Sequence, residues 1–128
     1  MTYRHAAVWM DHHEARIFHV TAEGFDGSSV SAPQHHVHRH PKGPEGGHDH
    51  PADQRRYFHD VAKALEGAEE ILVVGPSTAK LQFLKYVHKE QSHGLEPHIV
   101  GIETVDHPTD GQLVAFVRKY FQAVDAKG

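Results

Sequence analysis

Apolar and polar residues alternate in short blocks over the first twenty positions of the chain. The blocks AAVWM (6–10) and ARIFHV (15–20) are rich in β-branched and aromatic residues, and the polar tetrapeptide DHHE lies between them. Blocks of this composition around a short polar connection are typical of two strands joined by a tight turn. We therefore predict a β-hairpin over residues 6–20.

A weaker β pattern follows the hairpin. After the glycine-containing break AEGFDGSS, the residues SVSAPQHHVHRH (29–40) alternate loosely between apolar and polar side chains. This alternation predicts a third strand. Because proline cannot donate a ladder hydrogen bond, Pro33 would confine that part of the strand to a sheet edge or a bulge.

The middle of the chain contains a segment rich in proline and glycine, followed by a segment with a helical pattern. Proline and glycine are dense between residues 40 and 52, and no long apolar side chain is available there to anchor the segment to a core. We expect an exposed loop. The next stretch, 51–67, starts with a proline and ends with a glycine, which is typical of helix boundaries. Its apolar residues recur at helical spacing, which predicts an amphipathic helix: Tyr57, Phe58, Val61, Ala62 and Leu65.

Two later runs are apolar without alternation. AEEILVVGP (68–76) is a continuous apolar run between charged and Gly-Pro boundaries, and PHIVGIETV (97–105) has a similar character. Continuous runs of strand length indicate strands that are covered on both faces. We predict two buried strands, the first of them central in the sheet.

Two further helices are predicted around these strands. The helix over 77–91 is expected to turn Leu81, Leu84 and Val87/His88 toward the core. The helix over 108–124 begins with Thr109 and Gln112, which match the S/T-x-x-E/Q capping box in which each side chain satisfies a free amide of the first turn.

The order of predicted elements is β-β-β-α-β-α-β-α. An antiparallel opening followed by β-α-β crossovers predicts an α/β fold with a mixed five-stranded sheet and helices on its faces. A length of 128 residues with 38% apolar composition fits a single domain over 1–128 that buries its own core.

Composition excludes several kinds of chemistry. The chain has no cysteine, so disulfides, iron–sulfur clusters, thiolate zinc sites and cysteine nucleophiles are excluded, and any metal must be held by His, Asp or Glu. The first apolar run is far shorter than a signal-peptide core or a membrane span. We therefore expect a cytoplasmic protein with no membrane partner.

Charge gives a local signal only. The formal net charge is −4, and fifteen histidines bring it toward zero near neutral pH, so bulk charge does not favour nucleic-acid binding and no DNA partner is expected. Residues 34–56 nevertheless concentrate positive side chains: Arg39, Lys42, Arg55 and Arg56.

Three strings in this order resemble one family. AAVWMDHHEARIFHV is similar to an opening hairpin, GGHDHPADQRRYFHDVAKAL to a glycine-rich loop that enters a basic helix, and ILVVGPSTAKLQFLKYV to a buried strand, turn and helix. Together they resemble the middle, Gly-Gly-Gln domain of archaeal and eukaryotic peptide-chain release factors and its stand-alone bacterial relatives, the translational machinery proteins. The resemblance spans most of the chain and implies an RNase H-like fold.

The resemblance implies a role in translation. In that family the Gly-Gly-Gln loop enters the peptidyl-transferase centre and helps water attack the ester between nascent peptide and tRNA. Here Gly46 and Gly47 occupy the glycine positions, whereas His48 stands where the family has glutamine. Glycines let a backbone pass close to RNA and offer an amide to an oxyanion. The departure at position 48 leaves open whether the chain is a peptidyl-tRNA hydrolase, and no cofactor is required.

The expected partner is a ribosome or tRNA, in a rescue, release-like or stress role. Arg39, Lys42, Arg55 and Arg56 would contact RNA phosphates at the base of the loop. The alternative is that paired arginines on a first helical turn are a solvated face. Tyr57 could stack on a base, although its spacing favours the core.

The histidines support a second hypothesis. In an extended chain His36, His38 and His40 would share one face, and His48, Asp49 or His50 could complete a site for zinc, nickel or copper. A His-rich metal-binding protein is therefore an alternative function. A third alternative is a binding module without chemistry, which could be a homodimer formed through an exposed sheet edge.

Three polar turns have ordinary structural interpretations beside functional ones. Asp11–Glu14 could hold a ligand but has the length of a hairpin turn. The GPSTAK turn could bind an anion, but helix capping by Ser77 is favoured because the spacing of a nucleotide loop is missing. Asp106, His107 and Asp110 could be catalytic, but we interpret Asp106-His107-Pro108 as a strand exit that leads into the Thr109 cap.

Overall fold

The chain folds into a five-stranded mixed sheet covered by helices on both faces. The computed structural model describes residues 3–21, 23–33, 51–90 and 94–127. The strand order across the sheet is β3-β2-β1-β4-β5. The strands are β1 (Tyr3–Met10), β2 (Glu14–Val20), β3 (Phe25–Ser31), β4 (Ala68–Gly75) and β5 (Ile99–Thr104). The helices are α1 (Pro51–Leu65), α2 (Ala79–Lys89) and α3 (Asp110–Lys127), with a short 3₁₀ turn, η4 (Glu96–His98), before β5.

The pairing follows from the connections. β1 and β2 form an antiparallel hairpin, and β3 continues antiparallel to β2. β4 lies parallel to β1, and β5 lies parallel to β4, as helical crossovers require. β2 therefore runs opposite to the other four strands. The predicted α/β fold with an RNase H-like mixed sheet of five strands is confirmed.

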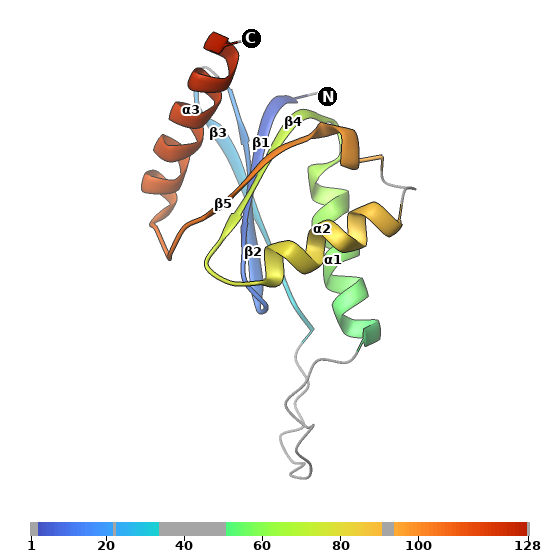
Figure 1. Ribbon diagram of the computed structural model, residues 1–128. Helices are drawn as coiled ribbons and strands as arrows, with labels where there is room; N and C mark the ends of the chain where they lie inside the picture. The colour runs from blue at the N-terminus through green and yellow to red at the C-terminus, as the bar shows by residue number, and fades with distance from the viewer. Residues whose placement is uncertain (1–2, 22, 34–50, 91–93, 128) are drawn as a thin grey trace.

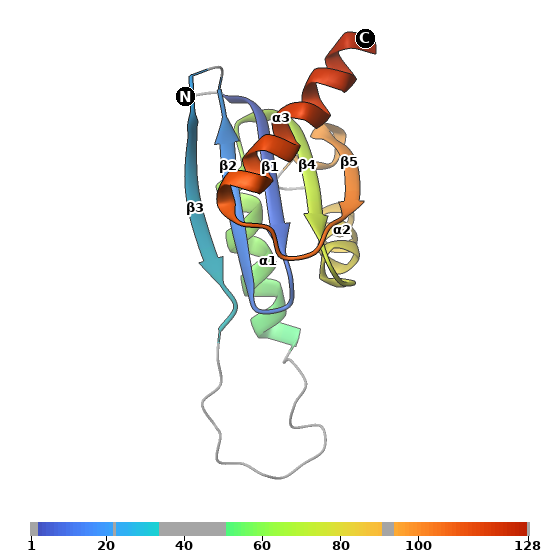
Figure 2. The same ribbon diagram turned by 90° about the vertical axis from the view of Figure 1, so that its left-hand side faces the viewer.

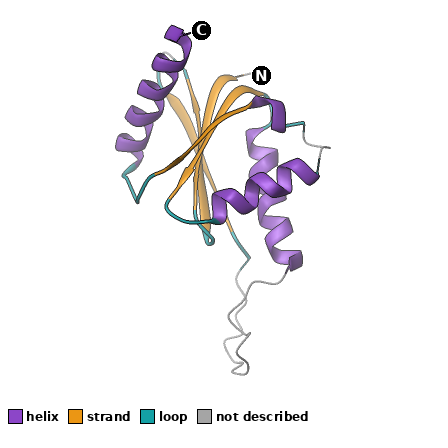
Figure 3. Ribbon diagram, in the orientation of Figure 1, coloured by secondary structure: helices purple, strands orange, loops and turns teal. Residues whose placement is uncertain are grey.

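The helices divide between the two faces of the sheet. Figures 1 and 3 show α1 and α2 together on one face and α3 alone on the other. Strands β1 and β4 are covered on both faces, so successive residues such as Leu72 and Val73 are both fully buried but belong to opposite cores. This explains why their sequences lack alternation.

Two glycines mark where helix and strand end. Gly67 has φ 95° and follows α1, and this left-handed conformation lets the chain turn into β4. Gly75 lies at the end of β4 so close to the Met10 carbonyl that a side chain there would overlap it. The end of β4 can therefore lie directly against the end of β1.

Most predicted elements are confirmed, but the third strand, the burial of β5 and the inward face of α2 differ from the prediction. The third strand is 25–31, not a strand within 29–40, and it includes the glycine-containing residues that we interpreted as a break. β5 is an edge strand whose Val100 is exposed, so it is not buried on both faces. In α2 the buried side chains are Ala79, Lys80, Phe83 and Val87, whereas Leu81 is 52% exposed.

The first and third helices agree with the sequence pattern. All five predicted inward residues of α1 are buried. The capping box of α3 is formed in both directions: the Thr109 N–H donates to Gln112 Oε1 at 3.0 Å, and the Gln112 N–H donates to Thr109 Oγ1 at 3.2 Å. Within the described residues, no helix is both long enough and apolar enough to cross a membrane.

Candidate functional site

The carboxyl ends of the parallel strands β1, β4 and β5 lie at one end of the sheet, the lower end in Figure 1. The turn between β1 and β2 and the first residues of all three helices lie at this same end. In open α/β sheets, ligands bind at this end, where loops from several strands meet. The candidate residues therefore divide into those on the α1/α2 side and those on the α3 side of this end.

The β1–β2 turn is closed by its own aspartate. Asp11 Oδ1 accepts hydrogen bonds from the N–H groups of His13 at 2.8 Å and Glu14 at 2.9 Å. The Asp11 N–H donates to the Glu14 carbonyl at 3.0 Å. The interpretation of Asp11–Glu14 as a hairpin turn is confirmed.

Among the residues that the structure describes, no group of three or more metal-ligating side chains is found.

Tyr57 ties the start of α1 to this turn. Its ring is buried, and its hydroxyl donates to the Asp11 carbonyl at 2.9 Å. Burial raises the pKa of the Tyr57 phenol, and the nearby negative charges of Asp11 and Glu14 raise it further. The hydroxyl therefore stays a neutral donor. Tyr57 is a packing and anchoring residue, and its buried ring leaves no face for stacking on a base.

The two segments that border residues 34–50 are both connected by hydrogen bonds to the β1–β2 turn, the second of them through Gln82 of α2. On one side, the Ala32 N–H donates to the His13 carbonyl at 2.8 Å and extends the pairing beyond β3. On the other side, Gln54 Nε2 donates to Gln82 Oε1 at 3.2 Å, and His12 Nε2 lies 3.2 Å from the same oxygen. The β1–β2 turn, α1 and α2 thus form one connected support.

Arg55 and Arg56 lie on the exposed surface of α1, near its first residue. Both are solvent-exposed, while the two residues that follow them are buried. Neither guanidinium forms an ion pair with another described residue. The positive charge of Arg55 does reach Tyr86: burial, the largest effect, raises the pKa of that phenol, and Arg55 opposes the rise. The two exposed guanidinium groups therefore place two positive charges at the start of α1.

The remaining predicted site residues lie outside the described part of the chain. These are Gly46, Gly47 and His48 of the loop, the basic residues Arg39 and Lys42, and the candidate metal ligands His36, His38, His40 and His50. For the loop, the described structure gives only its two borders, Pro33 and the first residue of α1. The prediction that a helix follows the loop directly is confirmed, because α1 begins at residue 51.

The turn before α2 differs from its prediction. Thr78, not Ser77, is the N-cap residue, and its side chain makes no capping hydrogen bond. The Ser77 hydroxyl is buried without a hydrogen-bond partner among the described residues. Lys80 is 6% exposed, and its Nζ donates to the Ser77 carbonyl at 2.8 Å. The sequence singled out this lysine at a turn but did not predict that its side chain would be buried.

On the α3 side, the strand exit leads into the helix cap as predicted. Trp9 Nε1 donates to the Asp106 carbonyl at 2.7 Å, which fixes the exit to the end of β1. His107 lies 3.1 Å from Asp106 Oδ1 and 3.9 Å from Asp11 Oδ2. Both His107 and Asp106 are exposed, so no buried acid–base pair is formed.

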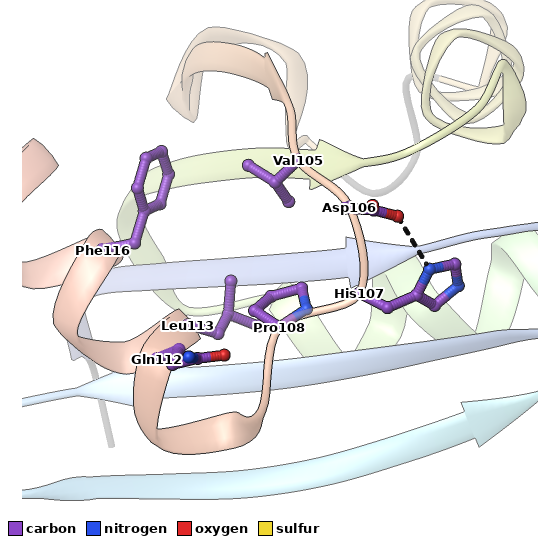
Figure 4. Close-up of a pocket in the computed structure, with 7 residues that line it drawn as sticks. All are labelled: Val105, Asp106, His107, Pro108, Gln112, Leu113 and Phe116. Atoms are coloured by element: carbon purple, nitrogen blue, oxygen red, sulfur yellow. Dashed lines mark hydrogen bonds and ion pairs between the residues drawn. The ribbon is translucent and has the colours of Figure 1, made fainter.

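A pocket of ≈ 350 Å³ lies between this exit and the first turns of α3. Figure 4 shows the apolar side chains of Val105, Leu113 and Phe116 along it, while the Asp106 carboxylate points away toward His107. Its other lining residues are Asp106, His107, Pro108 and Gln112. Gln112 is engaged in the helix cap. The pocket therefore combines apolar walls with the exposed His107–Asp106 pair at one side.

Comparison with known proteins shows which solved structures have a similar fold. No protein-family model and no curated protein sequence matches the chain. Solved structures match well. Pelota from Archaeoglobus fulgidus superposes with a TM-score of 0.61 and 13% identity, over 93% of this chain and 32% of its own. The archaeal translation termination factor aRF1 gives 0.55 and 13%, over 96% of this chain and 38% of its own.

A third match is Dom34 from S. cerevisiae, a translation termination-like factor involved in RNA quality control pathways and interacting with Hbs1. Its TM-score is 0.53 at 10% identity, over 78% of this chain and 28% of its own. The chain thus spans about a third of the length of these proteins. The fold is that of one part of translation termination factors and their relatives, as the resemblance in the sequence implied.

Proposed function

We propose that this protein is a translation factor-like protein of the cytoplasm that associates with ribosomes or tRNA. It would contact RNA through Gly46, Gly47 and His48 and through the basic start of α1. One observation carries the proposal: Arg55 and Arg56 are exposed at the start of the helix that directly follows the glycine pair, in a fold shared with translation termination factors.

The anchoring of α1 supports this role. Tyr57 is held by the Asp11 carbonyl, so the preceding turn of the helix cannot rotate away from the sheet. The two guanidinium groups are thereby presented from a rigid element. Arginine suits phosphate because its planar group donates two parallel hydrogen bonds and keeps its charge at all physiological pH values.

The proposal assigns RNA contact to the loop and does not assign hydrolysis. An imidazole at position 48 differs from the glutamine amide of the release factors in reach, shape and charge. The described residues at this end of the sheet add no acid–base pair that would compensate, since the candidate His107 is exposed beside an exposed carboxylate.

Ribosome co-sedimentation at a series of salt concentrations tests the proposal. The Arg55→Glu/Arg56→Glu variant should bind much more weakly than the wild type. The slope of log affinity against log salt should fall by about 2, because each phosphate contact contributes about 0.9 to it. A chelator that binds zinc, nickel and copper but leaves magnesium in solution removes any contribution of metal bound to the histidines without dissociating the ribosome.

The matched control is Lys63→Glu/Lys119→Glu, which reverses two exposed charges away from the start of α1. Since both double variants change the net charge equally, a loss of binding confined to the arginine variant supports a local phosphate contact. Equal losses in both variants, or no loss in either, would contradict the proposal.

A further inference from the structure

β3 forms one edge of the sheet, and its outward-pointing backbone groups can be assigned. The Thr21 N–H donates to the Gly24 carbonyl at 2.9 Å, and the Ala32 N–H donates to the His13 carbonyl at 2.8 Å. Hydrogen-bonded pairs alternate along an antiparallel ladder. Even-numbered residues of β3 therefore bond to β2. The odd-numbered residues direct their N–H and C=O groups away from the sheet: Phe25, Gly27, Ser29 and Ser31.

Among the described residues, this edge has few of the features that normally prevent pairing. β3 pairs with β2 over seven residues without a register shift, and its sequence FDGSSVS contains no lysine, arginine or proline. Proteins usually protect edge strands with such residues, with bulges or with covering elements. Figure 2 shows no described helix or strand beyond β3. The opposite edge differs, since β5 is shorter, carries Glu103 and has a register irregularity against β4.

We propose that a second copy of this chain pairs with β3, strand to strand and antiparallel. Full overlap about a two-fold axis places Ser28 opposite Ser28 of the second copy, so that the outward groups of Ser29 meet those of Gly27. Asp26, the only charged residue of the strand, then faces Val30 rather than another carboxylate. The strand is therefore self-complementary in both hydrogen bonding and charge, as an isologous interface requires.

Phe25 adds an apolar contact to this pairing. It packs edge-to-face on Phe18 with ring centroids 5.6 Å apart, yet 45% of its surface stays exposed because α3 does not cover it. In the dimer Phe25 lies across from Ser31 of the second copy, at the rim of the new sheet. Stable dimers bury roughly 1,200–2,000 Å², and a single strand pair buries less, so we expect a reversible dimer with micromolar or weaker affinity.

The pairing has a consequence for the proposed RNA-binding end. Because the two β3 strands run in opposite directions, the two α1 start points lie at opposite ends of the joined sheet. Each copy therefore keeps its Arg55 and Arg56 accessible. The dimer is independent of RNA binding, and its test does not rely on ribosomes.

Sedimentation velocity over a concentration series measures the dimer. The wild type should shift from monomer to dimer with rising concentration. Ser29→Pro removes one outward N–H while the bonds from β3 to β2 stay intact, and proline is tolerated at sheet edges. We expect this variant to remain monomeric at the highest concentration. Ser29→Thr keeps the N–H and should dimerise like the wild type.

Amide hydrogen exchange gives a second measurement that does not depend on variants folding. In the wild type, the amides of Phe25, Gly27, Ser29 and Ser31 should become protected as the concentration rises, while those of Asp26, Ser28 and Val30 are protected throughout. A monomer at all concentrations would overturn the proposal. So would a dimer without concentration-dependent protection at these four amides, which places the interface elsewhere. Protection of the four amides in the monomer would mean that another part of the same chain covers the edge.

Discussion

Both faces of the sheet pack their helices on an apolar core, but they add different contacts to it. On the α1/α2 face, an aromatic cluster joins the two helices, with Phe58 5.7 Å from Phe83 and 5.8 Å from Tyr86 between ring centroids. On the α3 face, the start of the helix is held by Arg16, which donates to Asp110 Oδ1 at 2.8 Å and to the Pro108 carbonyl at 3.0 Å. The same guanidinium lies over the Trp9 ring at 4.6 Å.

This difference shows which interactions support the proposed RNA-binding end. Arg55 and Arg56 lie one turn from the aromatic cluster and next to Tyr57, so their position depends on apolar packing and one buried hydroxyl. The α3 face also has an apolar core, in which Leu113, Val117 and Phe121 are buried, but the start of α3 is held in addition by a partly exposed ion pair. Perturbing the aromatic cluster should thus affect the start of α1 most, and adding salt should affect the start of α3 most.

The largest predicted effect comes from Phe83→Ala. The ring is fully buried between α2 and the sheet, and its removal deletes a contact to Phe58 and leaves a cavity. The free energy of unfolding should fall by about 3–5 kcal/mol. Urea denaturation measures it.

Leu81→Ala on the same helix is the matched control for Phe83→Ala. Leu81 is more than half exposed, so this variant should change the free energy of unfolding by no more than about 0.5 kcal/mol. If the two variants were equally destabilised, α2 would be rotated relative to the orientation described for it.

Tyr57→Phe should have the next largest effect. The change keeps the buried ring but removes the donor to the Asp11 carbonyl, so a partly buried acceptor loses its partner. We expect a loss of about 1–3 kcal/mol in the free energy of unfolding near neutral pH. Ribosome binding should weaken as well, because the arginines that precede Tyr57 are less firmly placed.

The pH dependence of this variant gives a sharper test. The pKa of Tyr57 lies above its ordinary value of 10.0 in the folded state, so the folded form retains the proton more tightly than the unfolded form. This contribution to stability is complete below pH 10 and decreases as the pH rises above it, by at most about 1.4 kcal/mol per pH unit. The difference between wild type and Tyr57→Phe should therefore shrink above pH 10. A constant difference across that range would contradict the buried, neutral hydroxyl.

The sequence predicted α1 and α3 well because each carries signals that depend only on neighbouring residues. Pro51 and Gly67 bound the first helix, and Thr109 and Gln112 cap the third helix through bonds three residues apart. Such local bonds do not depend on where the helix lies in the fold. The order of the elements also followed from the residue pattern, and the resemblance to release factors added the expected family of folds.

The errors have one cause, which is that burial depends on distant parts of the chain. Lys80 and Phe83 share the buried side of α2, while Leu81 does not, and nothing local distinguishes these two stripes. The buried lysine makes the inward face of α2 hard to recognise from the sequence, because a charged residue is normally expected on the exposed face. Here the long alkyl chain of Lys80 packs like an apolar residue, while its Nζ donates to the Ser77 carbonyl. β3 was misplaced because an edge strand of serine and glycine pairs through its backbone and buries little.

The smallest predicted effect is the coupling energy of the Arg16–Asp110 ion pair on the α3 face. A double-mutant cycle with Arg16→Met, Asp110→Asn and the double variant isolates the ion pair from the other contacts of Arg16 to Trp9 and Pro108. Asp110 is 60% exposed at its side chain, so the coupling energy should be only about 0.2–1 kcal/mol. It should decrease further in about 1 M salt, where charges are screened beyond about 3 Å. The effect of Phe83→Ala, measured in the same salt, should not decrease in this way, because hydrophobic burial is not screened. A coupling that is insensitive to salt, or as large as the core effect, would show that the two faces are held by the same kind of interaction.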